Sequence, residues 1–179
     1  LMNILLTILI PVLSKILGYV LDYIINGRFA LEIFTPRLCS FYYLIEQREL
    51  AVIDLPLSIV NKGMKTLCIR DLNLEVYNKG DNIRHTFILC ALLDDFPSKE
   101  QKVVSQFVVR GGETYNGWFR FIPKDSKFRF TQGDYIIEVY VKVNSSHWKK
   151  YKVFEVNLDQ NDIEELRKGK MVINSKVKG

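Results

Sequence analysis

Residues 50–77 read LAVIDLPLSIVNKGMKTLCIRDLNLEVY, and this stretch decides the fold. Its apolar residues alternate with polar ones, as at Leu55, Leu57 and Ile59. That period is typical of a strand covered on one face. Asn61-Lys62-Gly63 interrupts the pattern with residues that favour a turn. The stretch therefore predicts two strands, over 50–60 and 66–77, joined by a short turn.

The second of these runs changes phase in its middle. Apolar residues occupy the odd positions Leu67 and Ile69 and then the even positions Leu72 and Leu74, so the alternation shifts by one residue near Arg70-Asp71. A single extra residue in one strand produces such a shift. We therefore expect a β-bulge at this point.

Similar apolar runs continue along the chain between turn-forming clusters, and one helix follows them. The helix begins near Asp159 or Asn161 and ends at Gly169, with acidic residues in its first turns and basic residues in its last. Short strands with almost no helix between them predict a mainly β fold, an antiparallel sandwich or barrel. The further strands are expected at 29–34, 84–93, 103–109, 115–122, 135–143 and 150–158.

Three landmarks follow one another in this part of the chain: Leu57-Ser-Ile-Val-Asn-Lys-Gly63, Gly112-Glu113-Thr114 leading into Trp118–Pro123, and Gly133-Asp134-Tyr135. Their order and spacing resemble those of bacterial immunoglobulin-like domains of the CARDB type. The resemblance implies an immunoglobulin-like antiparallel β-sandwich over residues 49–158. It also makes Tyr135 similar to the tyrosine corner of immunoglobulin and fibronectin folds, in which a hydroxyl ties an inter-strand corner.

Residues 1–26 differ from the rest because they are almost continuously apolar. A helix of this length rises about 1.5 Å per residue and covers the roughly 30 Å hydrocarbon core of a bilayer. We therefore expect a transmembrane helix at the N-terminal side, in contact with membrane lipid. Its few polar and small residues fall on one stripe, where Ser14, Lys15, Gly18 and Asp22 form a face suited to packing against a partner protein or a second copy.

The flanking charges indicate how this helix is oriented. No Lys or Arg precedes it, whereas Arg28, Arg37 and Arg48 follow it, which favours a cytoplasmic domain over an extracellular one. No cleavage site typical of a signal peptide follows, so we expect the helix to be retained. The segment 27–48 is then a juxtamembrane region that includes the first strand.

The composition points to no chemical activity. A net charge of +5 is too small to indicate a nucleic-acid partner. Cys39, Cys68 and Cys90 contain no C-x-x-C pair, so no zinc site is indicated, and a bridge between Cys68 and Cys90 stays open. His85 and His147 lie at predicted strand edges, away from any nucleophile motif. We expect no catalytic residue, no metal, no cofactor and no small-molecule substrate.

One further cluster, Trp148, Lys149, Lys150, Tyr151 and Lys152, mixes aromatic and basic residues. Such a composition is found in binding surfaces. The alternation that continues to Leu158 indicates instead an edge strand guarded by lysines. Both interpretations of this cluster stay open. After the strand, residues 159–179 form the short helix and a basic tail.

The sequence thus predicts a single-pass membrane protein whose immunoglobulin-like module binds another protein, as a non-enzymatic accessory or assembly subunit. An alternative is a structural protein whose apolar helix is buried in a large assembly. A carbohydrate-active or hydrolytic module, built on Asp94 and Asp95, is a third class.

Overall fold

A computed structural model describes residues 14–18, 31–44, 50–93, 101–102, 106–144 and 147–179. The described chain is mainly β, with one eight-residue helix after the long strands. The elements are β1 (Leu31–Ile33), β2 (Cys39–Leu44), β3 (Leu50–Asn61), β4 (Leu67–Asn78), β5 (His85–Leu93), β6 (Gln101–Lys102), β7 (Phe107–Val109), β8 (Thr114–Pro123), β9 (Gly133–Val143), β10 (Lys149–Leu158), α2 (Gln160–Arg167) and β11 (Val172–Asn174).

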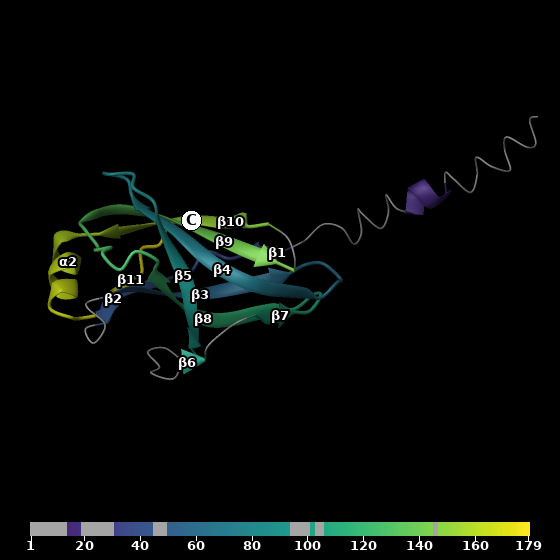
Figure 1. Cartoon of the computed structure of the whole chain (residues 1–179), viewed down its shortest axis with the longest axis horizontal. Coiled ribbons are helices and arrows are strands. Elements are labelled where there is room, and N and C mark those ends of the chain that lie inside the picture. Colours follow the sequence, from purple (N-terminus) through teal and green to yellow (C-terminus); the bar gives the residue numbers. More distant parts are fainter. Residues whose placement is uncertain (1–13, 19–30, 45–49, 94–100, 103–105, 145–146) are drawn as a thin grey trace, which may run out of the picture.

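All strand pairs are antiparallel, and they form one sheet in the order β10-β9-β4-β5-β8-β3-β2-β11. The short strands β1, β6 and β7 pair with β3, β5 and β4. Strand β5 joins the two halves because it pairs with β4 on one side and with β8 on the other. The sheet curls nearly into a barrel, and its two outer edges approach each other where Glu155 of β10 bridges to Lys178 (Figure 1).

The bulge expected near Arg70-Asp71 is confirmed. The pairing of β4 with β9 shifts between Ile69 and Asp71, so Ile69 and Leu72 both face the core. Strands β3 and β4 also lie close to the predicted 50–60 and 66–77. One-sided burial holds in β4 and in the second half of β3, whereas Ala51 to Leu55 in the first half of β3 are buried on both faces.

The core is rich in aromatic rings that meet edge to face. Phe128 is the centre of one group, because its ring lies 5.1 Å from Phe87 and 5.1 Å from Phe130. Phe41 contacts Phe130 at 5.3 Å in the same manner. Such pairs add about 0.5–1.5 kcal/mol each to the free energy of burial. The segment between β8 and β9 therefore closes one end of the barrel by packing.

At the opposite end, two of the landmark motifs meet. The Asn61 side chain is buried and donates to the carbonyls of Lys65 (2.8 Å) and Val109 (3.0 Å). The Gly112 amide donates to the Asn61 carbonyl at 2.8 Å. A Cβ on Gly111 would lie 2.2 Å from the carbonyl oxygen of Met64, so the two turns approach too closely for a side chain there.

The third landmark lies at the Phe130 end. The Tyr135 hydroxyl donates to the Thr131 carbonyl at 3.0 Å and accepts from the Thr131 amide at 2.7 Å. This contact returns to the backbone a few residues upstream, as in a tyrosine corner. Asn78 adds a hydrogen bond to the Gln132 carbonyl at 3.1 Å. The hydroxyl therefore fixes the corner that precedes β9, as the sequence predicted for Tyr135.

Helix α2 begins with a capping box. The Asp159 side chain accepts from the Asp162 amide at 2.9 Å, and the Asp162 side chain accepts from the Asp159 amide at 3.0 Å. Ile163 and Leu166 are buried against the barrel. Gly169 follows the helix with a φ of 74°, a conformation that favours glycine. The predicted helix is confirmed in type and position.

The sheet extends beyond the range expected from the sequence. Strands β2 and β11 were not predicted, and they pair with each other through Val172 and Phe41. Of the strand expected at 29–34, the structure describes Leu31–Ile33, which pairs with the end of β3.

The predicted transmembrane segment, residues 1–26, lies mostly outside the described residues. Residues 14–18 are helical and exposed. None of the helices in the described part of the chain has both the length and the apolar character that a membrane crossing requires.

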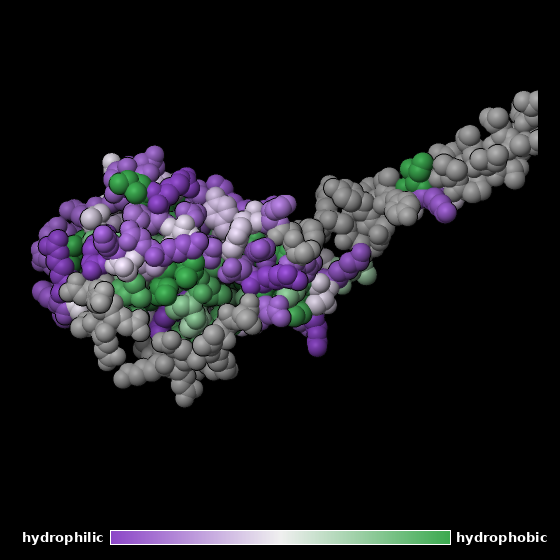
Figure 2. Space-filling view, viewed as in Figure 1, coloured by the Kyte–Doolittle hydropathy of each residue, from purple (hydrophilic) through white to green (hydrophobic). Residues whose placement is uncertain are grey.

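Most of the described surface is hydrophilic in the view of Figure 2, and an apolar area lies over β5 and β8. In the pairing of β5 with β8, Ile88 lies opposite Ile122, and both are only partly buried. Two carboxylates are nevertheless buried away from the aromatic core, Asp54 on β3 and Glu138 on β9. Glu138 belongs to the candidate site, and Asp54 belongs to a second charged pair; both are described below.

Candidate functional site

The predicted cluster of Trp148, Lys149, Lys150, Tyr151 and Lys152 is divided by the structure. The pairing of β10 with β9 shifts between Lys150 and Lys152, which leaves Tyr151 at a bulge. Tyr151 packs against the core, and the Lys149 amino group lies 5.3 Å from the centre of its ring. Burial accordingly raises the pKa of Tyr151. Trp148 and Lys150 instead belong to the outer face of the sheet.

Trp148 lines a groove on the outer face of β4 and β9, which we call the Trp148 groove. Its volume is about 450 Å³, within the usual range of about 300–1,000 Å³ for ligand sites. Trp148 keeps 40% of its surface exposed there. The groove is lined by Asn73, Glu75, Arg84, Thr86, Lys124, Tyr140 and Trp148.

A buried carboxylate holds the groove residues in place. One oxygen of Glu138 accepts hydrogen bonds from Arg84 (2.8 Å) and from the Tyr140 hydroxyl (3.0 Å), and the other accepts from Lys150 (3.1 Å). The Arg84 guanidinium also lies 4.4 Å from the centre of the Tyr77 ring. Three donors and a cation–π contact therefore fix the positions of Arg84 and Tyr140.

These contacts shift several pKa values. Burial alone raises the pKa of Glu138, but the hydrogen bonds from Arg84, Lys150 and Tyr140 outweigh it and lower the net pKa. The hydrogen bond between Lys150 and Glu138 raises the pKa of Lys150. Burial, followed by the hydrogen bond to Glu138, raises the pKa of Tyr140. Glu138 is therefore an ionised anchor, a state unsuited to a general acid.

Glu75 lies directly opposite Glu138 in the pairing of β4 with β9. Like charges at such a position are destabilising unless each has its own partner. Glu75 accepts a hydrogen bond from the Thr86 hydroxyl at 2.6 Å. Beside it, the side-chain oxygen of Asn73 is buried and has no hydrogen-bond partner in the structure. That oxygen is closed to solvent, so the groove itself presents the Glu75 carboxylate next to exposed aromatic and cationic groups.

A second charged pair lies on β3 and β8. Arg120 donates to both oxygens of Asp54, from Nε and from Nη2, each at 3.0 Å. Tyr42 donates to Asp54 as well, at 3.0 Å, and its pKa is raised by burial and by the charge of Asp54. Asp54 is fully buried and the Arg120 side chain is 9% exposed. The Asp54–Arg120 pair is therefore closed to solvent, and its role is structural.

His85 and Asp81 each make local contacts. The His85 ring meets Phe128 edge to face, with the ring centres 4.7 Å apart, and Asp81 accepts from the Ile83 amide within its own turn. Across the described ranges, no group of three His, Cys, Asp or Glu side chains is close enough to hold a metal ion. Asp94 and Asp95 lie outside the described residues.

The three cysteines are free thiols, so Cys68 and Cys90 are not bridged in the structure. Cys39 is fully buried, and burial followed by the charge of Asp54 raises its pKa. Cys68 and Cys90 are only partly buried. Both lie outside the alternating core face.

Of the predicted helix-packing face, Ser14, Lys15 and Gly18 are described and Asp22 is not. The three described residues are exposed on one helical turn, and a Cβ on Gly18 would meet no atom within 4 Å. Their use as a packing face stays a prediction.

The sequence analysis missed the residues that build the groove. Glu138 was the available signal, because it is the one acidic residue inside the apolar run Tyr135–Val143. A charge at such a position is rarely buried without partners. Its partners Arg84 and Lys150 come from distant parts of the chain, so the sequence alone did not bring them together.

No family model matches this chain, and no curated protein matches it. The resemblance to CARDB-type domains is therefore not confirmed. Among solved structures, the chain is similar to a FixG-related protein from Vibrio parahaemolyticus, with 12% identity and a TM-score of 0.37. The match covers 73% of this chain and 94% of that one. Function has to be inferred from the geometry of this chain itself.

Proposed function

We propose that the chain is a non-enzymatic binding module of the immunoglobulin-like type, which docks onto another protein through the Trp148 groove. The observation that carries the proposal is the groove itself. It combines an exposed Trp, a Tyr and an Arg with the carboxylate of Glu75. Trp, Tyr and Arg are the residues that most often supply binding energy at protein interfaces.

The strand pairing supports the immunoglobulin-like type. Strands β1, β2, β3, β8 and β5 form one half of the sheet, and β4, β9 and β10 form the other. This matches the division of a seven-stranded immunoglobulin domain into sheets ABED and CFG. The Tyr135 corner lies at the start of β9, the counterpart of strand F. Strand β5, which pairs with both halves, is the main departure from two separate sheets.

The same proposal includes the membrane. Residues 1–26 have the length and apolar composition of an anchor, and the arginines after them favour a cytoplasmic module. On this view the chain is an accessory or assembly subunit held at a membrane, with the Ser14, Lys15 and Gly18 face available to a second helix. Carbonate extraction of the full chain tests the anchor, because a peripheral protein would be released.

Site-specific photo-crosslinking tests the groove. Trp148 is replaced by p-benzoylphenylalanine in the full chain, expressed in its native cells, and Met64 is replaced in a matched control. Met64 is 77% exposed and belongs to the turn between β3 and β4, away from the groove. We expect a discrete protein adduct from position 148 and none from position 64, and we expect W148A to abolish co-purification of that protein.

Two outcomes would count against this function. Identical adducts from both positions would mean that the groove has no particular partner. Binding of purified oligosaccharides, lost in W148A, would make the groove a carbohydrate site, because an exposed Trp beside amide and carboxylate groups can also hold a sugar ring.

A further inference from the structure

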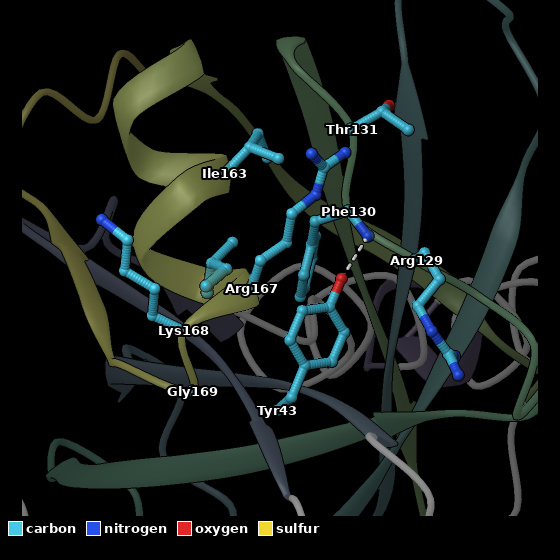
Figure 3. Close-up of a pocket in the computed structure, with 9 residues that line it drawn as sticks. Tyr43, Arg129, Phe130, Thr131, Ile163, Arg167, Lys168 and Gly169 are labelled. Carbon is cyan, nitrogen blue, oxygen red and sulfur yellow. Dashed lines mark hydrogen bonds between the residues drawn. The ribbon is translucent and has the colours of Figure 1, made fainter.

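A second cavity lies at the α2 end of the barrel, away from the Trp148 groove. It opens between the last turn of α2, the segment Arg129–Thr131 and Tyr43 on β2 (Figure 3), with a volume of about 490 Å³. The Phe130 amide donates to the Tyr43 hydroxyl at 2.8 Å, which joins two of its walls. The cavity is therefore built from three separate parts of the chain, each fixed by its own contacts.

The walls of this pocket are largely apolar. Ile163 and Leu166 face it from the helix, and Phe130 and the ring of Tyr43 face it from the barrel. The rings of Tyr43 and Phe130 lie 5.7 Å apart. A hydrocarbon chain or a small ring placed here would be removed from water on several sides, which is favourable in proportion to its apolar area.

The charged residues of the pocket are all cationic: Arg129, Arg167 and Lys168, with no Asp or Glu among the described lining residues. They are not equivalent. Lys168 is paired with Glu165 at 3.0 Å. Arg129 donates to the carbonyls of Ser126 and Phe128, and in Figure 3 it lies on the far side of Tyr43 from the helix.

Arg167 is different, because its guanidinium extends from α2 toward Phe130 and Thr131 (Figure 3). Among the described residues, no carboxylate forms an ion pair with it. The neighbouring helix carbonyls are already satisfied, since the Lys168 amide donates to Glu164 and Glu165 and the Gly169 amide donates to Leu166. A guanidinium fork beside an apolar pocket is suited to a planar anionic group.

We propose that this pocket binds an amphiphile with a carboxylate or phosphate headgroup, the anion on Arg167 and the apolar part against Phe130, Ile163 and Leu166. The volume lies within the range of about 300–1,000 Å³ that is usual for small-molecule sites. The proposal is independent of the Trp148 groove, because no residue lines both cavities.

The position of the pocket favours a free amphiphile over a lipid within a bilayer. Helix α2 lies at one end of the barrel, and β1 begins near the other, where Leu31 pairs with Asn61 (Figure 1). If residues 1–26 anchor the chain, the pocket is on the side remote from the membrane. A free amphiphile and a membrane lipid both carry an anionic headgroup on an apolar tail. Separate probes are therefore needed to distinguish them.

The test uses the full chain in a zwitterionic detergent with ¹³C-labelled decanoate as the probe and decanol as the uncharged control. We expect saturable decanoate binding, with magnetisation transfer from its methylenes to the Ile163 methyls and the Phe130 ring. R167Q should weaken binding by about tenfold to a hundredfold, the usual value of one charge-assisted hydrogen bond. The matched control R110Q removes the same charge from an exposed turn and should leave binding unchanged.

Sedimentation with vesicles of phosphatidylglycerol, and of phosphatidylcholine as control, separates the two sources. Vesicle binding that R167Q abolishes, without decanoate binding, would assign the pocket to a lipid headgroup. Equal affinity for decanol and decanoate, or unchanged binding in R167Q with an unchanged melting temperature, would overturn the proposal. Absence of binding to decanoate and to both vesicles would overturn it as well. W148A retains the pocket, so loss of partner docking and loss of the amphiphile are distinguishable.

Discussion

Asp54 and Glu138 are both buried carboxylates held by cations, yet their surroundings differ. Asp54 is enclosed with Arg120, whose side chain is 9% exposed, whereas the Glu138 partners Arg84 and Lys150 are 49% and 46% exposed. Solvent therefore reaches one network and not the other. An enclosed ion pair is costly to break, because removal of one partner leaves an unpaired buried charge, while a pair with exposed cations can also exchange contacts with a ligand.

The largest effect should come from breaking the enclosed pair. Arg120→Leu leaves Asp54 buried without its cation, and we expect a loss of about 3–5 kcal/mol in the free energy of unfolding. Urea denaturation measures it. The double variant Asp54→Leu with Arg120→Leu should recover most of the loss, because an apolar pair of similar volume can replace a buried ion pair. A single variant as stable as the parent would show that Asp54 is not enclosed.

The thiol beside the enclosed pair provides a second measurement. Burial raises the pKa of Cys90 from 9.0 to about 11, against the opposing effect of Arg120. Because the thiolate is the reactive form, Cys90 should be alkylated by iodoacetamide about a hundredfold more slowly in the native protein than in urea at about pH 8. Peptide mass spectrometry gives the rates. Equal alkylation rates in the native protein and in urea would contradict the burial of the Cys90 thiol.

A smaller effect is expected from the open network. Glu138→Gln removes an ionised acceptor from three donors and should cost about 1–3 kcal/mol near neutral pH, toward the lower end because two of the donors are half in solvent. The folded pKa of Glu138 lies below its ordinary 4.5. Its contribution is therefore complete above that value and is lost as the pH falls through the lower folded pKa.

Urea midpoints measured at a series of pH values test this prediction, with Glu155→Gln as control. Glu155 is also paired, with Lys79, but is 45% exposed. We expect the parent and the E138Q protein to converge in acid. A difference that persists unchanged at the lowest pH would mean that packing, and not charge, is responsible.

The smallest effect should come from Lys150→Gln. Arg84 and Tyr140 continue to satisfy Glu138, and the lost pair is screened by solvent. We expect no measurable shift of the urea midpoint at physiological salt. A loss comparable to that of E138Q would indicate that Lys150 is less accessible than its exposure suggests.

The fold was predictable where a local pattern decides it. One-sided burial produces the alternation in β4 and in the second half of β3, and the phase shift near Arg70 marked a real bulge. The capping residues of α2 lie within one turn of each other. Strand β2 carries no such signal, because its first four residues are buried on both faces and do not alternate. Strand β11 has only three residues, too few for a period.

The site was less predictable, because it depends on register between distant strands. Composition grouped Trp148 with Tyr151, but the bulge in β10 turns Tyr151 toward the core. Glu138 and Arg84 are 54 positions apart and meet only when β4, β5 and β9 are aligned. The Arg167 pocket likewise requires the end of α2, the segment between β8 and β9, and strand β2 to come together. No local sequence pattern predicts these contacts between distant parts of the chain.

The pairing of β11 with β2 has a consequence for synthesis of the chain. Val172 and Phe41 are neighbours in the sheet although nearly the whole domain separates them in sequence, and Lys178 bridges to β10 in the same region. A nascent chain that has not yet produced residues 172–178 therefore leaves the edges of β2 and β10 uncovered. Uncovered edges are where strands from other chains add. Translation that stalls just before Val172 should then yield a product prone to aggregate, and a chaperone that covers strand edges would be needed until this strand is made.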